Sequence, residues 1–118
     1  MNKATIIASA SRIFVENVEE TLNFYINKLG FELINKVPNL YGMVQRDDFQ
    51  IHFAVFNDRF PNKNQVQHLL FWIPEIDAFF KELQSKSIKF IEPITQRIYG
   101  NKEFVFEDNN GNIITICD

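Results

Sequence analysis

The sequence has few of the residues that cross-link or interrupt a chain: one cysteine, four glycines and four prolines in 118 residues. Because Cys117 is alone, no internal disulfide can form, which excludes a disulfide-stabilised scaffold and favours a reducing compartment such as the cytoplasm. No apolar run approaches the roughly 20 residues that span a membrane. The apolar stretch before Arg12 is too short for a signal peptide, so we interpret it as a disordered tip.

Positive charge is also scarce. The net charge is −3 and no long run of lysine or arginine occurs, so a nucleic-acid partner is not expected. A glycine-rich phosphate loop, a Gly-x-Ser-x-Gly elbow and a Cys-x-x-Cys pair are absent. Cys117 would need His52 or His68 beside it to act as a nucleophile, and we do not expect this at the end of the chain.

Apolar residues, in contrast, are plentiful. They make up 46% of the sequence, and thirteen are phenylalanines. This is enough for the core of one compact domain. The number of phenylalanines indicates that the core, or a pocket, is aromatic.

The first half of the chain predicts a strand, a helix and three further strands. Ile13 and Val15 alternate with Arg12 and Phe14, which is the period-2 pattern of a strand with two different faces. Asn17 is the predicted N-cap of the helix, with Glu20 three residues later as in a capping box, and Gly30 is expected to end the helix. The three later strands are predicted over residues 31–37, 41–46 and 47–56.

The second half repeats this order. A strand is predicted over residues 68–73, a helix after Pro74, and then strands near residues 88–91, 101–108 and 112–118. An internal repeat of this size is a signal of the fold. We predict an α+β domain of two βαβββ modules, with curved mixed sheets and the helices outside. Module one spans residues 4–57, the polar linker residues 57–66, and module two residues 67–118.

The stretch "FEDNNGNIITICD" closes the chain and has two readings, a calcium loop or a hairpin turn. With Gly111 as the glycine of an EF-hand loop, Phe106 would stand at the first ligand position and Cys117 at the final acid. Neither residue fits, so the calcium reading fails. Asn-Gly is a strong hairpin signal, because both residues tolerate positive φ.

Three stretches resemble the vicinal oxygen chelate superfamily, which includes glyoxalase I, extradiol dioxygenases, and fosfomycin- and bleomycin-resistance proteins. They are "NVEETLNFYINKLGFEL", "HLLFWIPEIDAFFKEL" and "YGNKEFVFEDNNGNIITI". The third is closest to the bleomycin-resistance-like branch, with Tyr99 in place of a tryptophan and Asn109-Asn110 in place of Pro-Asp. The resemblance covers nearly the whole chain and implies the glyoxalase/bleomycin-resistance-like fold.

The resemblance also places four positions where the enzymes of the superfamily hold a divalent metal. They fall on Ala10, His52, His68 and Thr115. Alanine has no donor atom and a neutral hydroxyl is a poor ligand, so His52 and His68 are the only plausible ligands. A catalytic zinc usually has three protein ligands and non-heme iron usually two histidines with a carboxylate. We therefore expect no metal; the alternative is Zn, Ni, Fe or Mn on these two histidines.

Strand alternation predicts which residues line the concave face of the sheets. A concave surface with aromatic walls and a few polar groups is typical of small-molecule sites. Arg12 is expected to pair with an anionic ligand or with an acid such as Glu103. The candidate ligand-binding residues are Arg12, Phe14, Gln50, His52, Phe56, His68, Leu70, Trp72, Tyr99, Glu103 and Thr115.

Fold alone does not fix function. We predict a binding protein that sequesters a small, partly aromatic ligand without chemistry, as the bleomycin-resistance branch does in antibiotic resistance. The alternative is a metal-dependent lyase, isomerase or dioxygenase with a degenerate metal site, and a scaffold with a decayed cleft is a third possibility. The resemblance also implies a homodimer with two clefts.

Overall fold

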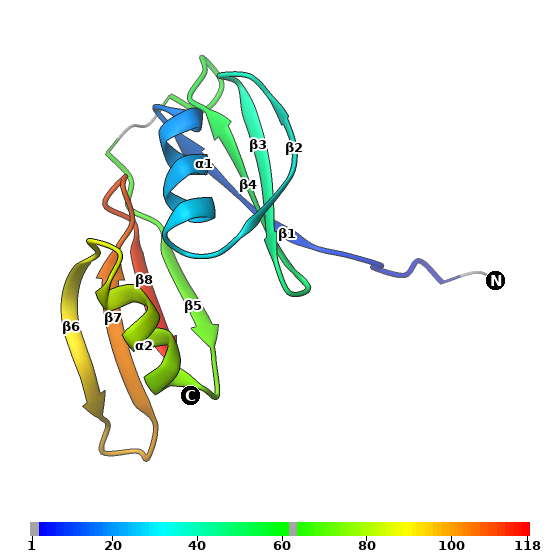
Figure 1. The fold of residues 1–118 in the computed structure, drawn as a ribbon. Coiled ribbons are helices and arrows are strands. Elements are labelled where there is room, and N and C mark those ends of the chain that lie inside the picture. Colours follow the sequence, from blue (N-terminus) through cyan, green and yellow to red (C-terminus); the bar gives the residue numbers. More distant parts are fainter. Residues whose placement is uncertain (1–2, 62–63) are drawn as a thin grey trace.

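The computed structural model describes residues 3–61 and 64–118 and consists of two four-stranded sheets, each with one helix against it (Figure 1). Module one contains β1 (Ala10–Val15), α1 (Val18–Asn27), β2 (Glu32–Val37), β3 (Tyr41–Arg46) and β4 (Phe49–Val55). Module two contains β5 (His68–Trp72), α2 (Ile76–Gln84), β6 (Lys89–Gln96), β7 (Lys102–Glu107) and β8 (Ile113–Cys117). The sheets have the orders β1-β4-β3-β2 and β5-β8-β7-β6, which confirms the predicted α+β class with two βαβββ units.

Helix α1 begins where the sequence predicts. Asn17 Oδ1 accepts a 3.0 Å hydrogen bond from the backbone N–H of Glu20. This N–H belongs to the first turn, where backbone donors have no carbonyl partner within the helix. The buried side of the helix includes Val18, Leu22 and Tyr25. The helix ends at Asn27, and Gly30 follows with a φ of +75°, which glycine adopts without steric cost.

Each sheet has one face towards its helix and one face turned away, which we call the concave face. In module one, β1 pairs in parallel with β4, with Ile13 opposite Phe53 and Arg12 opposite His52. Ile13 and Phe53 are buried in the core, whereas Arg12 is exposed and His52 half-buried. Since successive side chains point to opposite faces of a strand, the core and the candidate site share the same strands.

Strand β6 is longer than the sequence predicts. A short strand was expected near residues 88–91, but β6 extends over Lys89–Gln96 and contains Pro93. Proline cannot donate to a neighbouring strand and is confined to sheet edges and bulges. β6 lies at the edge of its sheet, and its register with β7 shifts on both sides of Glu92. The edge position and these irregularities accommodate the proline.

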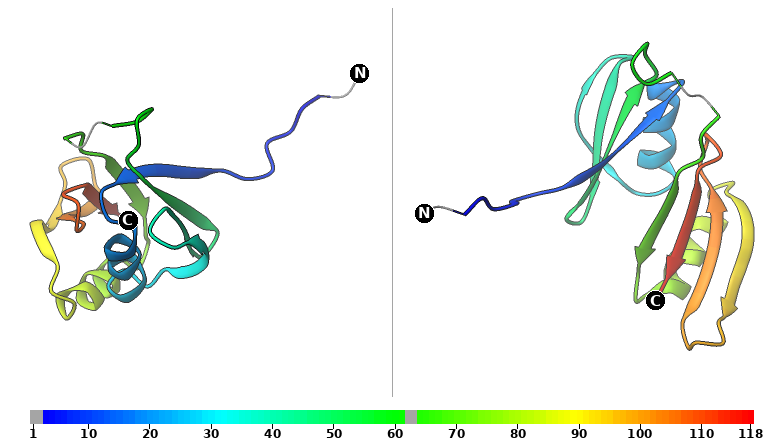
Figure 2. Two further views of the ribbon diagram at one scale, coloured as in Figure 1. Left: turned by 90° about the horizontal axis from the view of Figure 1, so that it is seen from above. Right: turned by 180° about the vertical axis from the view of Figure 1, so that it is seen from behind.

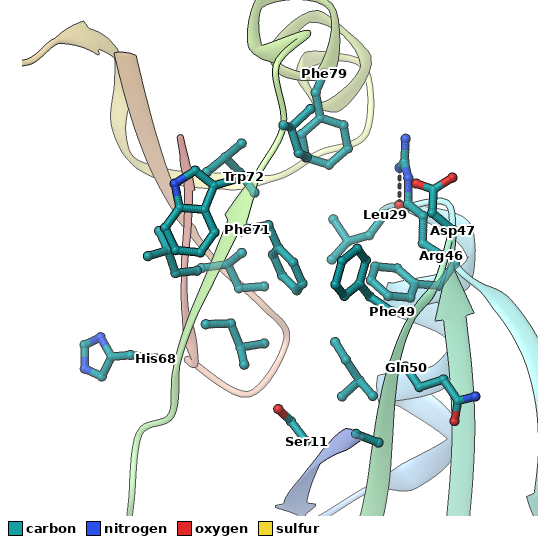
Figure 3. A pocket seen from close by; sticks show the side chains of 18 of the residues that line it. Ser11, Leu29, Arg46, Asp47, Phe49, Gln50, His68, Phe71, Trp72 and Phe79 are labelled. Carbon is teal, nitrogen blue, oxygen red and sulfur yellow. Dashed lines mark hydrogen bonds between the residues drawn. The ribbon is translucent and has the colours of Figure 1, made fainter. Parts of the chain in front are cut away.

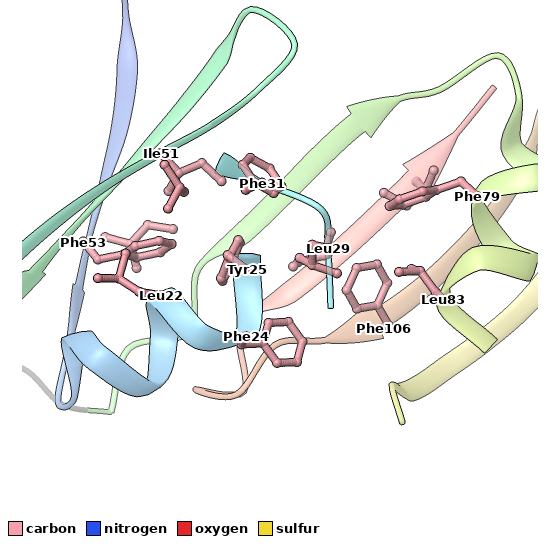
Figure 4. Close-up of a cluster of buried hydrophobic side chains, with 14 of the residues drawn as sticks. Leu22, Phe24, Tyr25, Leu29, Phe31, Ile51, Phe53, Phe79, Leu83 and Phe106 are labelled. Atoms are coloured by element: carbon pink, nitrogen blue, oxygen red, sulfur yellow. The ribbon is translucent and has the colours of Figure 1, made fainter. Parts of the chain in front are cut away.

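One hydrophobic core extends through both modules (Figure 4). The rings of Phe31 and Phe71 meet edge to face at the junction, with centroids 6.5 Å apart. Arg46, at the end of β3, also crosses the junction: it donates to the Leu29 carbonyl at 2.6 Å and pairs with Glu82 at 3.6 Å. The two modules are therefore fixed against each other on the helix side of both sheets.

The predicted hairpin turn joins β7 to β8 and also contacts module one. Gly111 has a φ of +80°, as the turn requires. Asp108 is buried and accepts a 2.7 Å hydrogen bond from the Tyr25 hydroxyl of α1. Asn109 and Asn110 donate to the Thr21 hydroxyl at 3.2 and 3.1 Å. The polar stretch that first suggested a calcium loop thus links the two modules.

Residues 3–9 precede β1 as an exposed segment without helix or strand, and Figures 1 and 2 show it extending away from both modules. Ile6 and Ile7 are 88% and 95% exposed. This segment belongs to the N-terminal tip that the sequence predicts. Met1 and Asn2 lie outside the described residues. No helix in the described part of the chain is long and apolar enough to cross a membrane.

Candidate ligand-binding site

The concave face of module one carries a chain of hydrogen bonds around His52. Arg12 Nε donates to the Tyr41 hydroxyl oxygen at 3.1 Å, and that hydroxyl lies 2.8 Å from His52 Nδ1. His52 Nε2 lies 3.1 Å from Gln50 Oε1, and Gln50 Nε2 donates to Gln45 at 3.3 Å. The structure therefore brings three predicted residues, Arg12, Gln50 and His52, into one group.

This arrangement fixes the tautomer of His52. The amide oxygen of Gln50 can only accept, so His52 Nε2 carries the proton and donates it. His52 Nδ1 then accepts from Tyr41. Burial, together with the positive charge of Arg12, lowers the pKa of His52 below its ordinary value. The ring is held as a neutral imidazole with both nitrogens engaged.

Tyr41 connects this group and is not among the residues predicted from the sequence. It lies on β3, where Tyr41, Met43 and Gln45 alternate with Gly42 and Val44. In the antiparallel register, Met43 is opposite His52 and Tyr41 opposite Ala54. The alternation alone would have placed Tyr41 on the concave face, had β3 been sorted in the same way as the longer strands.

An aromatic cavity of about 230 Å³ adjoins Arg12. Phe14 and Phe60 stack at its wall, with ring centroids 4.7 Å apart. Phe60 comes from the segment after β4, which the sequence analysis treated as linker. The cavity is lined by Arg12, Phe14, Phe56, Arg59, Phe60, Pro61, Gln65 and Gln67. Two predicted aromatic residues, Phe14 and Phe56, thus line the same cavity as Arg12.

On module two, Glu103 forms a second polar group. It accepts hydrogen bonds from the Tyr99 hydroxyl at 2.7 Å and from Arg97 Nε at 3.0 Å, and Arg97 also pairs with Glu92. The hydrogen bond from Tyr99, with help from Arg97, lowers the pKa of Glu103. Arg12 does not pair with Glu103, because Arg97, directly after β6, bonds Glu103 and Arg12 bonds Tyr41.

The other predicted residues of module two lie along β5 and β8. His68, Leu70 and Trp72 alternate along β5, and Thr115 on β8 is opposite Leu70 in the parallel register. Figure 3 shows His68 and Trp72 on the side of β5 away from Phe71. Trp72 is 67% exposed and Leu70 46%. This face is open to solvent in the single chain.

A larger cleft of about 550 Å³ lies between the modules (Figure 3). Phe31, Phe71 and Phe79 line it, and Phe49 at its edge is 67% exposed. Four predicted residues, Gln50, His68, Leu70 and Trp72, also line this cleft. The sequence does not predict that they share a cleft between the modules, because that depends on how the two modules pack.

The four positions that the resemblance assigns to a metal do not fit one. Ala10 offers no donor, Thr115 offers a neutral hydroxyl, and both ring nitrogens of His52 are engaged with Tyr41 and Gln50. Within residues 3–61 and 64–118, no group of three or more histidine, cysteine or acidic side chains is arranged to hold an ion.

The model of the Glyoxalase/Bleomycin resistance protein/Dioxygenase superfamily matches residues 6–116. The chain belongs to this superfamily. The match confirms the resemblance at the level of the superfamily. No curated protein sequence matches the chain.

Solved structures of this superfamily fold are similar over almost the whole chain. TioX from Micromonospora sp. ML1 has a TM-score of 0.84 at 9% identity, over 93% of this chain and 96% of that one. TnmS3, an antibiotic binding protein from Streptomyces sp. CB03234, has a TM-score of 0.78 at 19% identity, over 98% and 97%. Lactoylglutathione lyase from Agrobacterium tumefaciens has 0.78 at 14%, over 98% and 95%. At these identities the similarity shows the fold alone.

Proposed function

We propose that this superfamily member is a binding protein that captures a small, partly aromatic molecule on its concave faces and performs no chemistry on it. The observation that carries the proposal is the composition of these faces. Trp72 and Leu70 are exposed on module two, while Phe14 and Phe56 line a cavity beside Arg12 on module one. Apolar and aromatic walls with a few placed polar groups are how ligand sites are usually built.

The similarity to TnmS3, described as an antibiotic binding protein, supports this proposal. The chemistry of the polar groups supports it as well. His52 has both ring nitrogens in hydrogen bonds, and Glu103 is paired with Tyr99 and Arg97. These groups are suited to orienting a ligand. The only thiol, Cys117, is buried, and burial followed by the charges of Glu103 and Asp118 raises its pKa, so it is not an activated nucleophile.

The proposal includes a homodimer in the cytoplasm. The contacts between the two modules lie on the helix side of their sheets, through Tyr25, Phe31 and Arg46. Trp72 and Leu70 stay exposed on the concave side. A second copy that covers this face would enclose the ligand and bury the exposed side chains. Size-exclusion chromatography with light scattering is expected to give twice the mass of the chain.

The test of capture uses Trp72, which is the only tryptophan and therefore reports directly on its own face. Titration with planar polycyclic antibiotics is expected to change its fluorescence and to saturate at one ligand per chain. Trp72→Leu is expected to abolish binding measured by calorimetry. Leu40→Ala is the control, because Leu40 is also exposed, at 57%, but lines neither the cleft between the modules nor the cavity beside Arg12. Equal loss in both variants, or no binding by a broad aromatic panel, would overturn the proposal.

A further inference from the structure

The four arginines of the chain divide into two kinds. Arg46 pairs with Glu82, and Arg97 pairs with Glu92 and Glu103. Among the described residues, Arg12 and Arg59 make no ion pair with any acidic side chain. Arg12 Nε donates to Tyr41, and the Arg59 guanidinium lies over the Phe60 ring at 5.4 Å. The ion pairs of Arg46 and Arg97 contribute to the fold. Within the part of the chain that the structure describes, no acidic partner accounts for the positions of Arg12 and Arg59.

Arg12 and Arg59 line the same cavity, although they come from β1 and from the segment after β4. The remaining lining residues are three phenylalanines, Pro61 and two glutamines, and none of them is acidic. Glu16 and Glu20 line a neighbouring cavity instead. In a chain with a net charge of −3, this is a local concentration of positive charge beside aromatic rings.

The guanidinium of Arg12 is held in place. Its Nε is bonded to the Tyr41 hydroxyl, and its Cζ lies 5.5 Å from the centre of the Tyr41 ring. This leaves its two terminal nitrogens as donors. A guanidinium presents its donors as a planar fork that matches a carboxylate, and a fixed fork loses less entropy on binding. The stacked Phe14 and Phe60 rings offer an apolar wall beside it.

We propose that this cavity receives the acidic end of the ligand, which is an aromatic carboxylate. The carboxylate lies between Arg12 and Arg59, and the adjoining ring packs against Phe14 and Phe60. A cavity of about 230 Å³ holds one aromatic ring with its carboxylate, and the rest of the ligand extends over the open concave face. This inference rests on the proposed capture function and adds the charge class of the molecule captured.

The test compares three probes of one shape: 2-naphthoate, the neutral 2-naphthamide and the cationic 2-naphthylmethylamine. Binding is followed by calorimetry and by NMR of the arginine side chains. We expect naphthoate to bind at least about tenfold tighter than naphthamide, since hydrogen bonds to charged groups are the stronger ones. Raising the salt from about 0.05 to about 0.3 M should weaken naphthoate binding and leave naphthamide binding unchanged.

Substitutions identify the groups. Arg59→Gln and Arg12→Gln are each expected to weaken naphthoate binding about tenfold and to leave naphthamide binding unchanged. Arg59 makes no side-chain hydrogen bond among those described, so its variant should fold normally. Lys81→Gln removes the same charge from the exposed side of α2 and is the control. Equal affinity for the three probes, or Arg59→Gln and Arg12→Gln binding naphthoate as the unsubstituted protein does, would overturn the inference.

Failure of the inference can be told apart from failure of the proposed function. If all three probes bind equally and Trp72→Leu abolishes binding, capture stands and the carboxylate preference falls. If naphthoate binds through Arg12 and Arg59 while no polycyclic compound contacts Trp72, the anion site stands and capture on the concave face falls. If no probe binds by either method, both are wrong.

Discussion

The hydroxyl of Tyr25 donates a 2.7 Å hydrogen bond to the carboxylate of Asp108, 83 residues later in the chain. The bond joins α1 of module one to the β7–β8 turn of module two. Asp108 is also held by the Asn112 side chain at 3.0 Å. Burial and the neighbouring carboxylate raise the pKa of Tyr25 well above 10, so the phenol stays a donor throughout the physiological range.

The first prediction concerns this bond. Tyr25→Phe is expected to lower the free energy of unfolding by about 1.5–3 kcal/mol, the usual value of a hydrogen bond to a charged group. Urea denaturation measures it. Tyr99→Phe is the control, because Tyr99 also donates to a carboxylate but is exposed, and its cost should stay within about 0.5 kcal/mol. Similar costs for the two variants would show that the buried bond does not hold the modules together.

The second prediction concerns Gly42 on β3, which lies directly under α1. A Cβ at this position would lie 2.6 Å from Leu22 Cδ2. Gly42→Ala is therefore expected to cost about 1–3 kcal/mol of stability through overpacking. In a Leu22→Ala background the same substitution should cost much less, because the clashing atoms are gone. Additive costs in this double-mutant cycle would exclude a direct clash.

The third prediction concerns the protonation of His52. Its pKa is expected below the ordinary value of about 6.5. On acidification the unfolded chain therefore binds the proton before the folded protein does. His52 lowers the free energy of unfolding as the pH falls from about 6.5 towards the pKa of the folded state, and it has no such effect above about pH 6.5. Imidazole ¹⁵N NMR above about pH 6.5 should show a neutral ring with its proton on Nε2. Arg12→Gln should raise the pKa of His52, and an unchanged midpoint would rule out the effect of Arg12.

The fourth prediction concerns Cys117. It is buried, and burial followed by the charges of Glu103 and Asp118 raises the pKa of its thiol. In the folded protein it should react with Ellman's reagent at neutral pH far more slowly than in urea, because the thiolate is the reactive form. Glu103→Gln should increase the folded-state rate modestly. A folded-state rate as fast as that of the unfolded chain would contradict the buried, neutral thiol.

The fifth prediction concerns metal binding. After dialysis against zinc, nickel, iron and manganese salts, tag-free protein is expected to retain no stoichiometric metal, because Ala10 and Thr115 are poor ligands. The double variant Ala10→His with Thr115→Glu supplies the missing donors and is expected to gain affinity. A stoichiometric ion in the original chain that is lost in His68→Ala would instead favour the metal-dependent lyase, isomerase or dioxygenase.

The sequence predicts what depends on local pattern. Alternation separates Ile51 and Phe53 from His52, and capping chemistry places the start of α1 at Asn17. The Asn-Gly pair predicts the β7–β8 turn. These features depend on residues close together in the chain, where strand and helix geometry fixes their relative directions.

The sequence does not predict contacts that depend on packing. Tyr41 meets Arg12 across 29 residues of sequence, and Phe60 stacks on Phe14 from a segment without a periodic pattern. The sequence names Glu103 as a candidate but does not identify Arg97 as its partner. Local pattern contains no information on which of several arginines will reach a given acid.

The shared core of the two modules has a consequence for the repeat itself. Phe31 and Phe71 bury each other, and Tyr25 supplies the donor that Asp108 requires. A chain of half this length would expose an aromatic flank and leave a buried carboxylate without its phenol. A single module would therefore need a second module against it to cover these groups, and the chain supplies both in one covalent unit. The two are not equivalent: Arg12 of module one and Arg59 just after it lie beside aromatic rings, whereas Glu103 is bonded to Arg97 in module two.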